Sequence, residues 1–238
     1  MEFAPGIHDL SQAMGGHVHA YLIVDGDGLT LIDTLYDTTG QRVLDVIQGV
    51  GRQPTDVQRI VLTHAHRSHL GGLAALKKAT GATVHAHSWE ADIISGERKA
   101  QPRISALIPM RPVRTYWRIY YLQVGMALGV GKHPPCPVDR TLADGDQVGP
   151  LQVLHTPGHS PGHLAFWWPE RRTLFAGDAI ATWPEFAPGW PAFNLNERQH
   201  RASLQRLAEL DAEVLAVGHG RPLTEDVAAR VRTLVDEG

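Results

Sequence analysis

Residues 59–69 read RIVLTHAHRSH, an apolar run that leads directly into three histidines. The run RIVLT is predicted to be a short buried strand, since it is brief, apolar and rich in β-branched residues. Alternate side chains of an extended chain point to the same side, so His64 and His66 can both reach one ion. His69 follows where the chain turns toward a helix, which brings its ring to a neighbouring position. This segment therefore predicts a metal site at a strand end.

Other candidate ligands also follow predicted strands, where a rigid scaffold can aim side chains into one site. His159 can complete a three-histidine site, Asp178 can bridge two cations through its two oxygens, and His219 can serve the second cation. Zinc suits these nitrogen and oxygen ligands, and iron or manganese would also be satisfied. Asp33 could hydrogen-bond a ligand histidine or simply end its strand. The stretches are TPGH at 156–159, GD at 177–178, GHG at 218–220 and, more weakly, LIDT at 31–34.

Predicted strands alternate with predicted helices on both sides of the histidine segment. This alternation favours a layered α/β domain with helices outside, and we expect residues 1–238 to form a single domain. The predicted strands are a hairpin over 19–33 and runs at 59–63, 82–86, 151–155, 162–168, 173–176 and 213–217, and the predicted helices span 38–50, 71–78 and 197–210.

Residues 89–137 contain several prolines, arginines and aromatic residues. They are predicted to be a helical insertion that forms a lid or pocket wall. Its arginines could bind an anionic substrate and its aromatics could line an apolar pocket. Alternatively, the aromatics pack the insertion against the core and the arginines are solvated. An apolar insertion could also serve as a dimer surface. The residues concerned are Arg103, Arg111, Arg114, Arg118, Tyr116, Trp117, Tyr120 and Tyr121, and the same question applies to Trp183, Trp190 and Phe193.

Composition limits the class of protein. The one cysteine, Cys136, excludes an internal disulfide framework and favours a reducing, cytoplasmic compartment. A net charge of -3 without a basic block gives no electrostatic footprint for nucleic acid. No signal peptide is recognisable at the N-terminus, and no apolar run reaches the roughly 18 residues of a membrane span. We therefore expect a small-molecule substrate, without nucleic acid or membrane as a partner.

The ordered motifs resemble the metallo-β-lactamase-fold superfamily, whose signature is H-x-H-x-D-H followed by separate His, Asp and His segments. The resemblance covers nearly the whole chain, from the LIDT strand to the GHG segment. It implies a four-layer αββα sandwich and a metal-dependent hydrolase. It further implies a first metal site of His64, His66 and His159 and a second of His69 and His219, with Asp178 bridging.

Ser68 departs from this signature, because the family's aspartate would stand at that position. A serine hydroxyl stays protonated at neutral pH and is a poor ligand. The second site then keeps His69, Asp178 and His219, and three ligands still make a catalytic zinc site with an open position for water. Two ions remain plausible, with the second bound more weakly, and a mononuclear enzyme is the alternative. Asp178 and Ser68 are the expected catalytic groups, Ser68 by hydrogen-bonding the attacking water.

The remaining histidines are predicted to lie outside the metal set. His155 falls within its strand, and His163 is predicted to be a structural group beside the ligands. The other assignments are strand positions for His17, His19, His85 and His87 and surface positions for His133 and His200, and Cys136 is predicted to be inert.

Several functions fit this pattern. The leading hypothesis is hydrolysis of an ester-like bond: a thioester, lactone, β-lactam or phosphoester. The missing signal peptide disfavours a secreted β-lactamase, and resemblance to glyoxalase II is incomplete. A mononuclear iron sulfur dioxygenase and a metal-binding protein of low activity are the alternatives.

Overall fold

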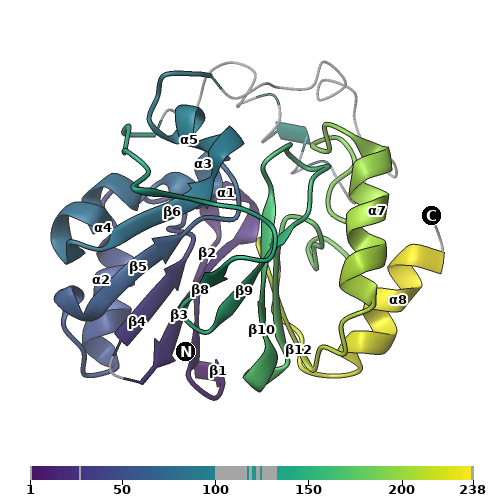
Figure 1. The fold of residues 1–238 in the computed structure, drawn as a ribbon, viewed down its shortest axis with the longest axis horizontal. Helices are drawn as coiled ribbons and strands as arrows, with labels where there is room; N and C mark the ends of the chain where they lie inside the picture. Colours follow the sequence, from purple (N-terminus) through teal and green to yellow (C-terminus); the bar gives the residue numbers. More distant parts are fainter. Residues whose placement is uncertain are drawn as a thin grey trace. The chain divides into compact units, whose positions relative to one another are not determined.

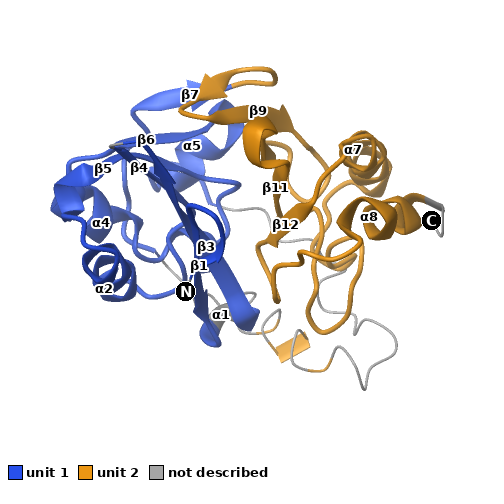
Figure 2. Ribbon diagram, turned by 90° about the horizontal axis from the view of Figure 1, so that it is seen from below, with its two compact units in different colours: residues 1–100, 132–142 blue, residues 101–131, 143–238 orange. Residues whose placement is uncertain are grey.

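A computed structural model describes residues 2–26, 28–99, 117, 120–121, 124 and 133–236. The chain divides into two compact units, one of residues 1–100 and 132–142 and the other of residues 101–131 and 143–238 (Figure 2). Each unit has its own sheet and its own helices. The single domain expected from the sequence stays a prediction.

The described part of unit 1 forms a seven-stranded sheet whose spatial order follows the sequence (Figure 1). The first four strands pair antiparallel, and the last four pair parallel. The carboxyl ends of neighbouring parallel strands meet at one edge, so the loops that follow β4 and β5 lie side by side. The strands are β1 (Glu2–Ala4), β2 (Ile7–Gln12), β3 (Val18–Asp25), β4 (Gly28–Ile32), β5 (Val57–Val61), β6 (Thr83–His87) and β7 (Arg140–Leu142).

Helices of unit 1 bury their apolar stripes against this sheet. Val43 and Ile47 of α2 and Leu73 and Leu76 of α4 are buried in one cluster with the strand residues. Each such side chain stabilises the fold by about 1.5–3 kcal/mol relative to exposure. The helices are α1 (Met14–His17), α2 (Gln41–Gly49), the 3-10 turn η1 (Pro54–Asp56), α3 (Arg67–Leu70), α4 (Leu73–Thr80) and α5 (Ser88–Ile94).

The described part of unit 2 forms a five-stranded sheet in the order β12-β11-β10-β9-β8. The pairs from β8 to β11 are antiparallel, and β11 and β12 are parallel. Consequently β9, β11 and β12 all run in one direction and end at the same edge. The strands are β8 (Gln147–Val148), β9 (Leu151–His155), β10 (Leu164–Trp168), β11 (Thr173–Gly177) and β12 (Val214–Val217).

Two helices cover the sheet of unit 2: α7 (Glu197–Ala208) and α8 (Val227–Asp236), with a 3-10 turn η3 (Pro169–Arg171) between β10 and β11. The Asn196 side chain caps α7 by accepting a hydrogen bond from the N–H of Gln199 at 3.1 Å. Leu204 and Leu207 then fall on the buried face of α7.

The α/β class is confirmed, because both units combine a sheet with helices. The predicted hairpin, the later strands and the three predicted helices are present within a few residues. The prediction for His17 is wrong, since it is the last residue of α1 and not part of a strand. The predicted insertion over 89–137 begins with α5, but the residues proposed to bind an anionic substrate, Arg103, Arg111, Arg114 and Arg118, lie outside the described residues, as does Tyr116.

Trp117 and Tyr121 are described and exposed, with their ring centroids 5.9 Å apart.

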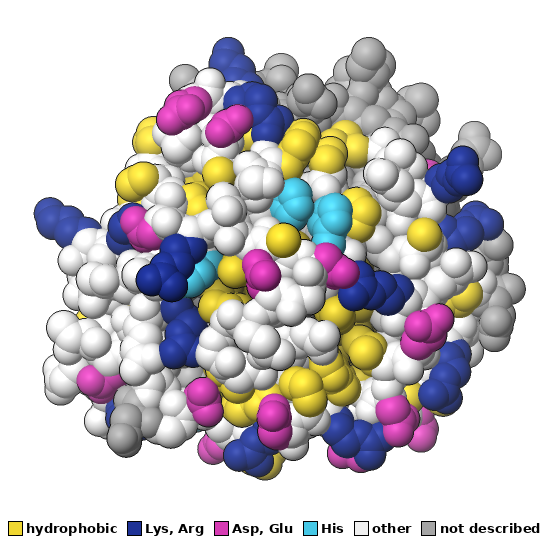
Figure 3. Space-filling model, in the orientation of Figure 1, with side chains coloured by type: hydrophobic (Ala, Val, Ile, Leu, Met, Phe, Trp, Pro, Cys, Tyr) yellow, Lys and Arg dark blue, Asp and Glu magenta, His cyan; other side chains and the backbone are white. Residues whose placement is uncertain are grey.

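On the face drawn in Figure 3, Lys and Arg side chains alternate with Asp and Glu and do not gather into one patch. No helix among the described residues combines the length and the apolar character needed to cross a bilayer.

Candidate metal centre

The three histidines of the HAHRSH segment lie together at the carboxyl end of β5. The ring centroids of His64 and His66 are 4.5 Å apart, as are those of His64 and His69. His66 is the residue before α3, and His69 lies within that helix. His64 and His69 are fully buried and His66 is half-buried. The predicted turn after the strand therefore gathers the three imidazoles.

Asp33, at the end of β4, organises two of these rings. Its Oδ2 lies 2.8 Å from both Nδ1 of His69 and Oγ1 of Thr63, and its Oδ1 accepts from the Thr63 N–H at 2.9 Å. Because the Thr63 hydroxyl donates to the carboxylate, its oxygen is left to accept from Nδ1 of His64 at 3.0 Å. Both histidines thus carry their proton on Nδ1, which leaves each Nε2 lone pair for a metal. The sequence left this role of Asp33 open.

The backbone around Asp33 makes this arrangement possible. Asp33 has a left-handed φ of 58°, and its N–H donates to Val61 O of the neighbouring strand at 3.0 Å. The following residue, Thr34, donates through its N–H and its hydroxyl to His69 O at 2.8 and 2.7 Å. The end of β4 therefore holds both the ring and the backbone of His69.

Glu90 of α5 is a further group that the sequence analysis missed. It is buried, with 1% of its surface exposed, and its Oε2 accepts from the N–H of Ala65 at 3.1 Å. Ala65 separates His64 from His66, so this bond fixes the backbone between two candidate ligands. Glu90 stands near the start of the predicted helical insertion, and its partner Ala65 lies 25 positions away, so no local sequence pattern indicates this contact.

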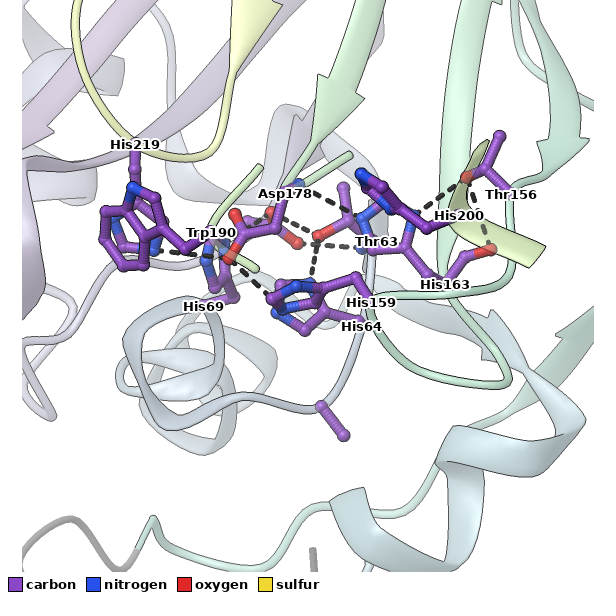
Figure 4. Close-up of polar contacts among 12 residues, drawn as sticks. Thr63, His64, His69, Thr156, His159, His163, Asp178, Trp190, His200 and His219 are labelled. Carbon is purple, nitrogen blue, oxygen red and sulfur yellow. Dashed lines mark hydrogen bonds and ion pairs between the residues drawn. The ribbon is translucent and has the colours of Figure 1, made fainter. Parts of the chain in front are cut away.

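Unit 2 gathers the other three predicted ligands. His159, Asp178 and His219 follow β9, β11 and β12, the strands that end at one edge of its sheet. Oδ2 of Asp178 lies 3.4 Å from Nε2 of His159 and 3.4 Å from Nε2 of His219. Figure 4 draws these three side chains. All three are buried. One carboxylate oxygen therefore lies equally far from the two imidazole nitrogens, and the bridging role of Asp178 stays a prediction.

Two glycines of these segments are required by close backbone contact. A Cβ at Gly158 would overlap the backbone of His200, and one at Gly220 would overlap Thr182 and Trp183 N. Gly158 has a φ of 138° and Gly220 a φ of 100°, which also disfavour other residues. The sequences TPGH and GHG therefore bring His159 and His219 to their positions.

Trp190 covers the ring of His219. Figure 4 shows the two rings close together. Their centroids are 4.2 Å apart with an angle of 31° between the planes. Trp190 is buried, and its Nε1–H donates to Trp183 O at 2.8 Å. Trp183 and Phe193 pack against it and are half-buried. Trp190 therefore packs against the candidate ligand His219.

The fold and these ligand segments agree with one family. The sequence profile of the Metallo-beta-lactamase superfamily matches residues 13–219, which span both units. The chain belongs to the metallo-beta-lactamase superfamily. This superfamily consists largely of metal-dependent hydrolases, and the nitrogen and oxygen donors of each unit suit a divalent cation.

Members of the superfamily resemble this chain at modest identity. The probable metallo-hydrolase YflN of Bacillus subtilis is 25% identical over 94% of this chain and 87% of its own length. A hydroxyacylglutathione hydrolase of Rhodospirillum rubrum is 27% identical over 68% of this chain and 48% of its own length. The crystal structure of TTHA1623 in a di-iron-bound form is 29% identical with a TM-score of 0.66, and covers 94% of this chain and 98% of that one.

The departure from the metallo-beta-lactamase signature, Ser68, lies in α3 between Arg67 and His69 and is half-buried. The role of Ser68 stays a prediction.

Arg67 stacks on the Tyr36 ring at 4.2 Å and donates to Tyr36 O at 2.5 Å. Burial lowers the pKa of Arg67, although nearby Tyr36 and Asp37 act in the opposite direction.

For the other side chains, the predictions for His163 and Cys136 are confirmed and the prediction for His200 is wrong. His163 contacts the backbone of Asp178, which confirms it as a structural group. Burial raises the pKa of Cys136, so its thiol is a poor nucleophile, as expected. The prediction of a surface position for His200 is wrong, because only 2% of it is exposed.

Proposed function

We propose that this protein is a metal-dependent hydrolase that cleaves an ester-like bond of a small molecule: a thioester, lactone, β-lactam or phosphoester. The observation that carries the proposal is the position of Asp178 Oδ2, 3.4 Å from Nε2 of both His159 and His219. Membership of a superfamily rich in metal-dependent hydrolases supports it.

The two ligand groups are proposed to supply one centre. His64, His66, His159 and Asp178 are assigned to one cation, and His69, Asp178 and His219 to a second. In unit 1, the Nδ1 bonds of His64 and His69 leave Nε2 as the ligand atom in both rings. In unit 2, the bridging position of Asp178 supports a carboxylate shared between the cations. The order of the motifs along the chain matches the family's order.

The donor set defines the chemistry. A bound divalent cation supplies a water whose pKa is lowered to about 7 and polarises the carbonyl or phosphoryl oxygen of the substrate. The histidines and Asp178 would hold the cations, and these side chains are buried except for His66, which is half-buried. Ser68 is proposed to hydrogen-bond the attacking water, but a serine hydroxyl cannot act as an anionic base. The second set then has three protein ligands and an open position.

Zinc is the proposed cation, because imidazole and carboxylate suit its borderline character. Iron has to be compared directly, since the similar protein TTHA1623 has been crystallised in a di-iron-bound form. The similarity to a hydroxyacylglutathione hydrolase makes thioesters the first substrates to test.

The experiment is metal analysis combined with a substrate panel. Protein prepared without added metal, and then with zinc, manganese or iron, is assayed on thioesters, lactones, a β-lactam and phosphoesters. We expect one or two divalent cations per chain and hydrolysis of at least one class. Asp178→Asn should remove both metal and activity, whereas Asp146→Asn, in an exposed turn, should change neither.

Separate variants test whether the two ligand groups act together. His66→Asn in unit 1 and His159→Asn in unit 2 should each weaken binding of the same cation. Retention of full metal content in either variant would contradict the shared centre. Oxygen uptake on a persulfide by an iron-loaded protein without hydrolysis would favour the dioxygenase, and bound metal without any activity would favour a binding protein.

A cytoplasmic location is proposed on the same basis as before, the single buried cysteine and its lack of a disulfide partner. Cell fractionation with an antibody against the protein tests it directly.

A further inference from the structure

His163 lies between two of the ligand-bearing loops of unit 2. It directly precedes β10, opposite the end of β9, and is fully buried. Its ring contacts Thr156, at the start of the TPGH loop, and Asp178, after β11 (Figure 4). One imidazole therefore touches the segments that carry two of the proposed ligands, although neither of its own nitrogens belongs to the proposed ligand set.

The hydrogen bonds of His163 determine its tautomer. The backbone N–H of Asp178 can only donate, and it points to Nε2 of His163 at 3.1 Å. Nε2 must therefore be the unprotonated nitrogen, and the proton is on Nδ1. Nδ1–H then donates to Oγ1 of Thr156 at 2.8 Å. The ring is neutral, with both nitrogens engaged.

Backbone bonds extend this connection to the TPGH loop. Thr156 N–H donates to His163 O at 2.9 Å, and Gly158 N–H donates to Ser160 O at 3.2 Å. The ring of His163 meets that of His159 edge-on, with centroids 5.8 Å apart and 73° between the planes. The loop from Thr156 to His163 is thus closed on itself, and His163 extends from it to the N–H of Asp178.

We propose that His163 is a positioning residue that fixes the backbone of Asp178 relative to the His159 loop. Its acceptor nitrogen orients the Asp178 N–H, which sets where the carboxylate lies between His159 and His219. The inference rests on the proposed metal centre, but the tautomer that it requires is a property of the metal-free protein.

Packing alone would not require a hydrogen-bond acceptor at His163. Any side chain of similar volume fills a buried space, whereas the N–H of Asp178 needs an acceptor at one point, and leaving it unsatisfied costs about 1–3 kcal/mol. The role can therefore be separated from simple filling by moving the acceptor.

Two conservative variants make that separation. Gln places an oxygen about as far from the backbone as Nε2 of histidine, so His163→Gln can keep the acceptor for Asp178. Asn reaches only as far as Nδ1, so His163→Asn keeps the contact with Thr156 and loses that with Asp178. Both side chains are neutral and both lack the ring.

We expect His163→Asn to bind zinc at least about tenfold more weakly than His163→Gln, in the range seen when groups supporting metal ligands are removed. Affinity is measured by competition with a chromogenic chelator, with Zn²⁺ as the probe. His155→Gln and His155→Asn are matched controls, because Nε2 of His155 contacts Pro161 O of the same loop at 2.8 Å. Both should keep wild-type affinity.

The second readout is the nitrogen NMR spectrum of the metal-free protein, with His163 assigned by its loss in His163→Gln. A proton on Nδ1 and an unprotonated Nε2 support the inference, and the opposite tautomer overturns it. Equal affinities of the Asn and Gln variants also overturn it. If the wild-type protein binds no cation, the proposed function fails, while the NMR result still decides the tautomer.

Discussion

Oδ2 of Asp33 lies 2.8 Å from Nδ1 of His69, and both side chains are buried. The same oxygen accepts from the Thr63 hydroxyl, which in turn accepts from His64. One carboxylate at the end of β4 therefore sets the proton position on two candidate ligands that lie more than thirty residues along the chain. Such outer carboxylates orient ligand histidines and raise their basicity.

Asp33→Asn should weaken metal binding and lower stability. Both carboxylate oxygens accept hydrogen bonds, so an amide NH₂ group at either position would face a donor. If it faces His69, that ring has to move its proton to Nε2, the atom proposed to bind metal. We expect a loss of about 10- to 100-fold in zinc affinity, and about 1–3 kcal/mol in the free energy of unfolding.

The measurements are chelator competition and urea unfolding of the metal-free protein. Asp45→Asn is the control, since Asp45 is exposed on α2, where its Oδ1 accepts a hydrogen bond from Nε2 of Gln41 at 2.7 Å. An Asp33→Asn protein with wild-type affinity would show that the carboxylate does not control His69.

Trp190→Ala should cost more metal affinity than its loss of stability explains. Removal of a buried Trp typically costs about 3–5 kcal/mol, and here it also removes the ring that packs on His219. Trp168→Ala is the matched control, because Trp168 is an equally buried Trp on β10 with no ring contact to His219 among the described residues. Both should unfold at lower urea concentration, but only Trp190→Ala should lose zinc affinity, and Trp190→Phe should recover part of it.

The ligand segments could be predicted because each combines a strand end with a glycine or a second histidine. In TPGH and GHG the glycine is needed for close backbone contact, so the motif reports local geometry directly. The supporting groups were harder to predict. Glu90 and Asp33 act through contacts with residues 25 and 36 positions away, which no local pattern reveals.

The buried position of His200 could have been predicted from the helical spacing of its neighbours. It lies on α7 with Ser203, Leu204 and Leu207, positions that share one face of a helix and are all buried. The short strands β1, β2, β7 and β8 and the helix α8 were also not predicted. Strands β1, β7 and β8 have only two or three residues, which is too few for periodicity to identify. Strand β2 has six, but its buried residues Ile7 and Leu10 are three positions apart and do not alternate as in a typical strand.

Ser68→Asp should tighten the second cation by about tenfold or more, equivalent to about 1.4 kcal/mol. The change restores the carboxylate of the family signature beside His69, which adds a charged ligand to a set of three. Zinc titration with metal counting would measure it, with Ser68→Asn as the control of similar size and no charge. Loss of metal or of folded protein in Ser68→Asp would show that the motif has been aligned wrongly.

His200 should make the protein less stable at acidic pH. Its Nε2–H donates to Pro188 O at 2.9 Å, so Nδ1 is the unprotonated nitrogen, and within the described residues this buried atom has no partner. Burial lowers the pKa of His200 below its ordinary 6.5, although Pro188 O and the Glu197 carboxylate act in the opposite direction. Protonation would place a second N–H in a buried position without an acceptor.

The direction in which pH changes the free energy of unfolding follows from proton binding. As pH falls below 6.5, the unfolded chain takes up a proton at His200 while the folded protein does not, so the free energy of unfolding falls. The contribution is complete above pH 6.5 and is lost toward the folded pKa, at no more than about 1.4 kcal/mol per pH unit. His200→Gln and His200→Asn cannot titrate, and Gln can still donate to Pro188 O. In urea unfolding of metal-free protein between about pH 8 and 5, both variants should show a shallower pH dependence than the wild type, whatever their absolute stability. Parallel pH profiles for all three proteins would mean that His200 is protonated equally in the folded and unfolded states.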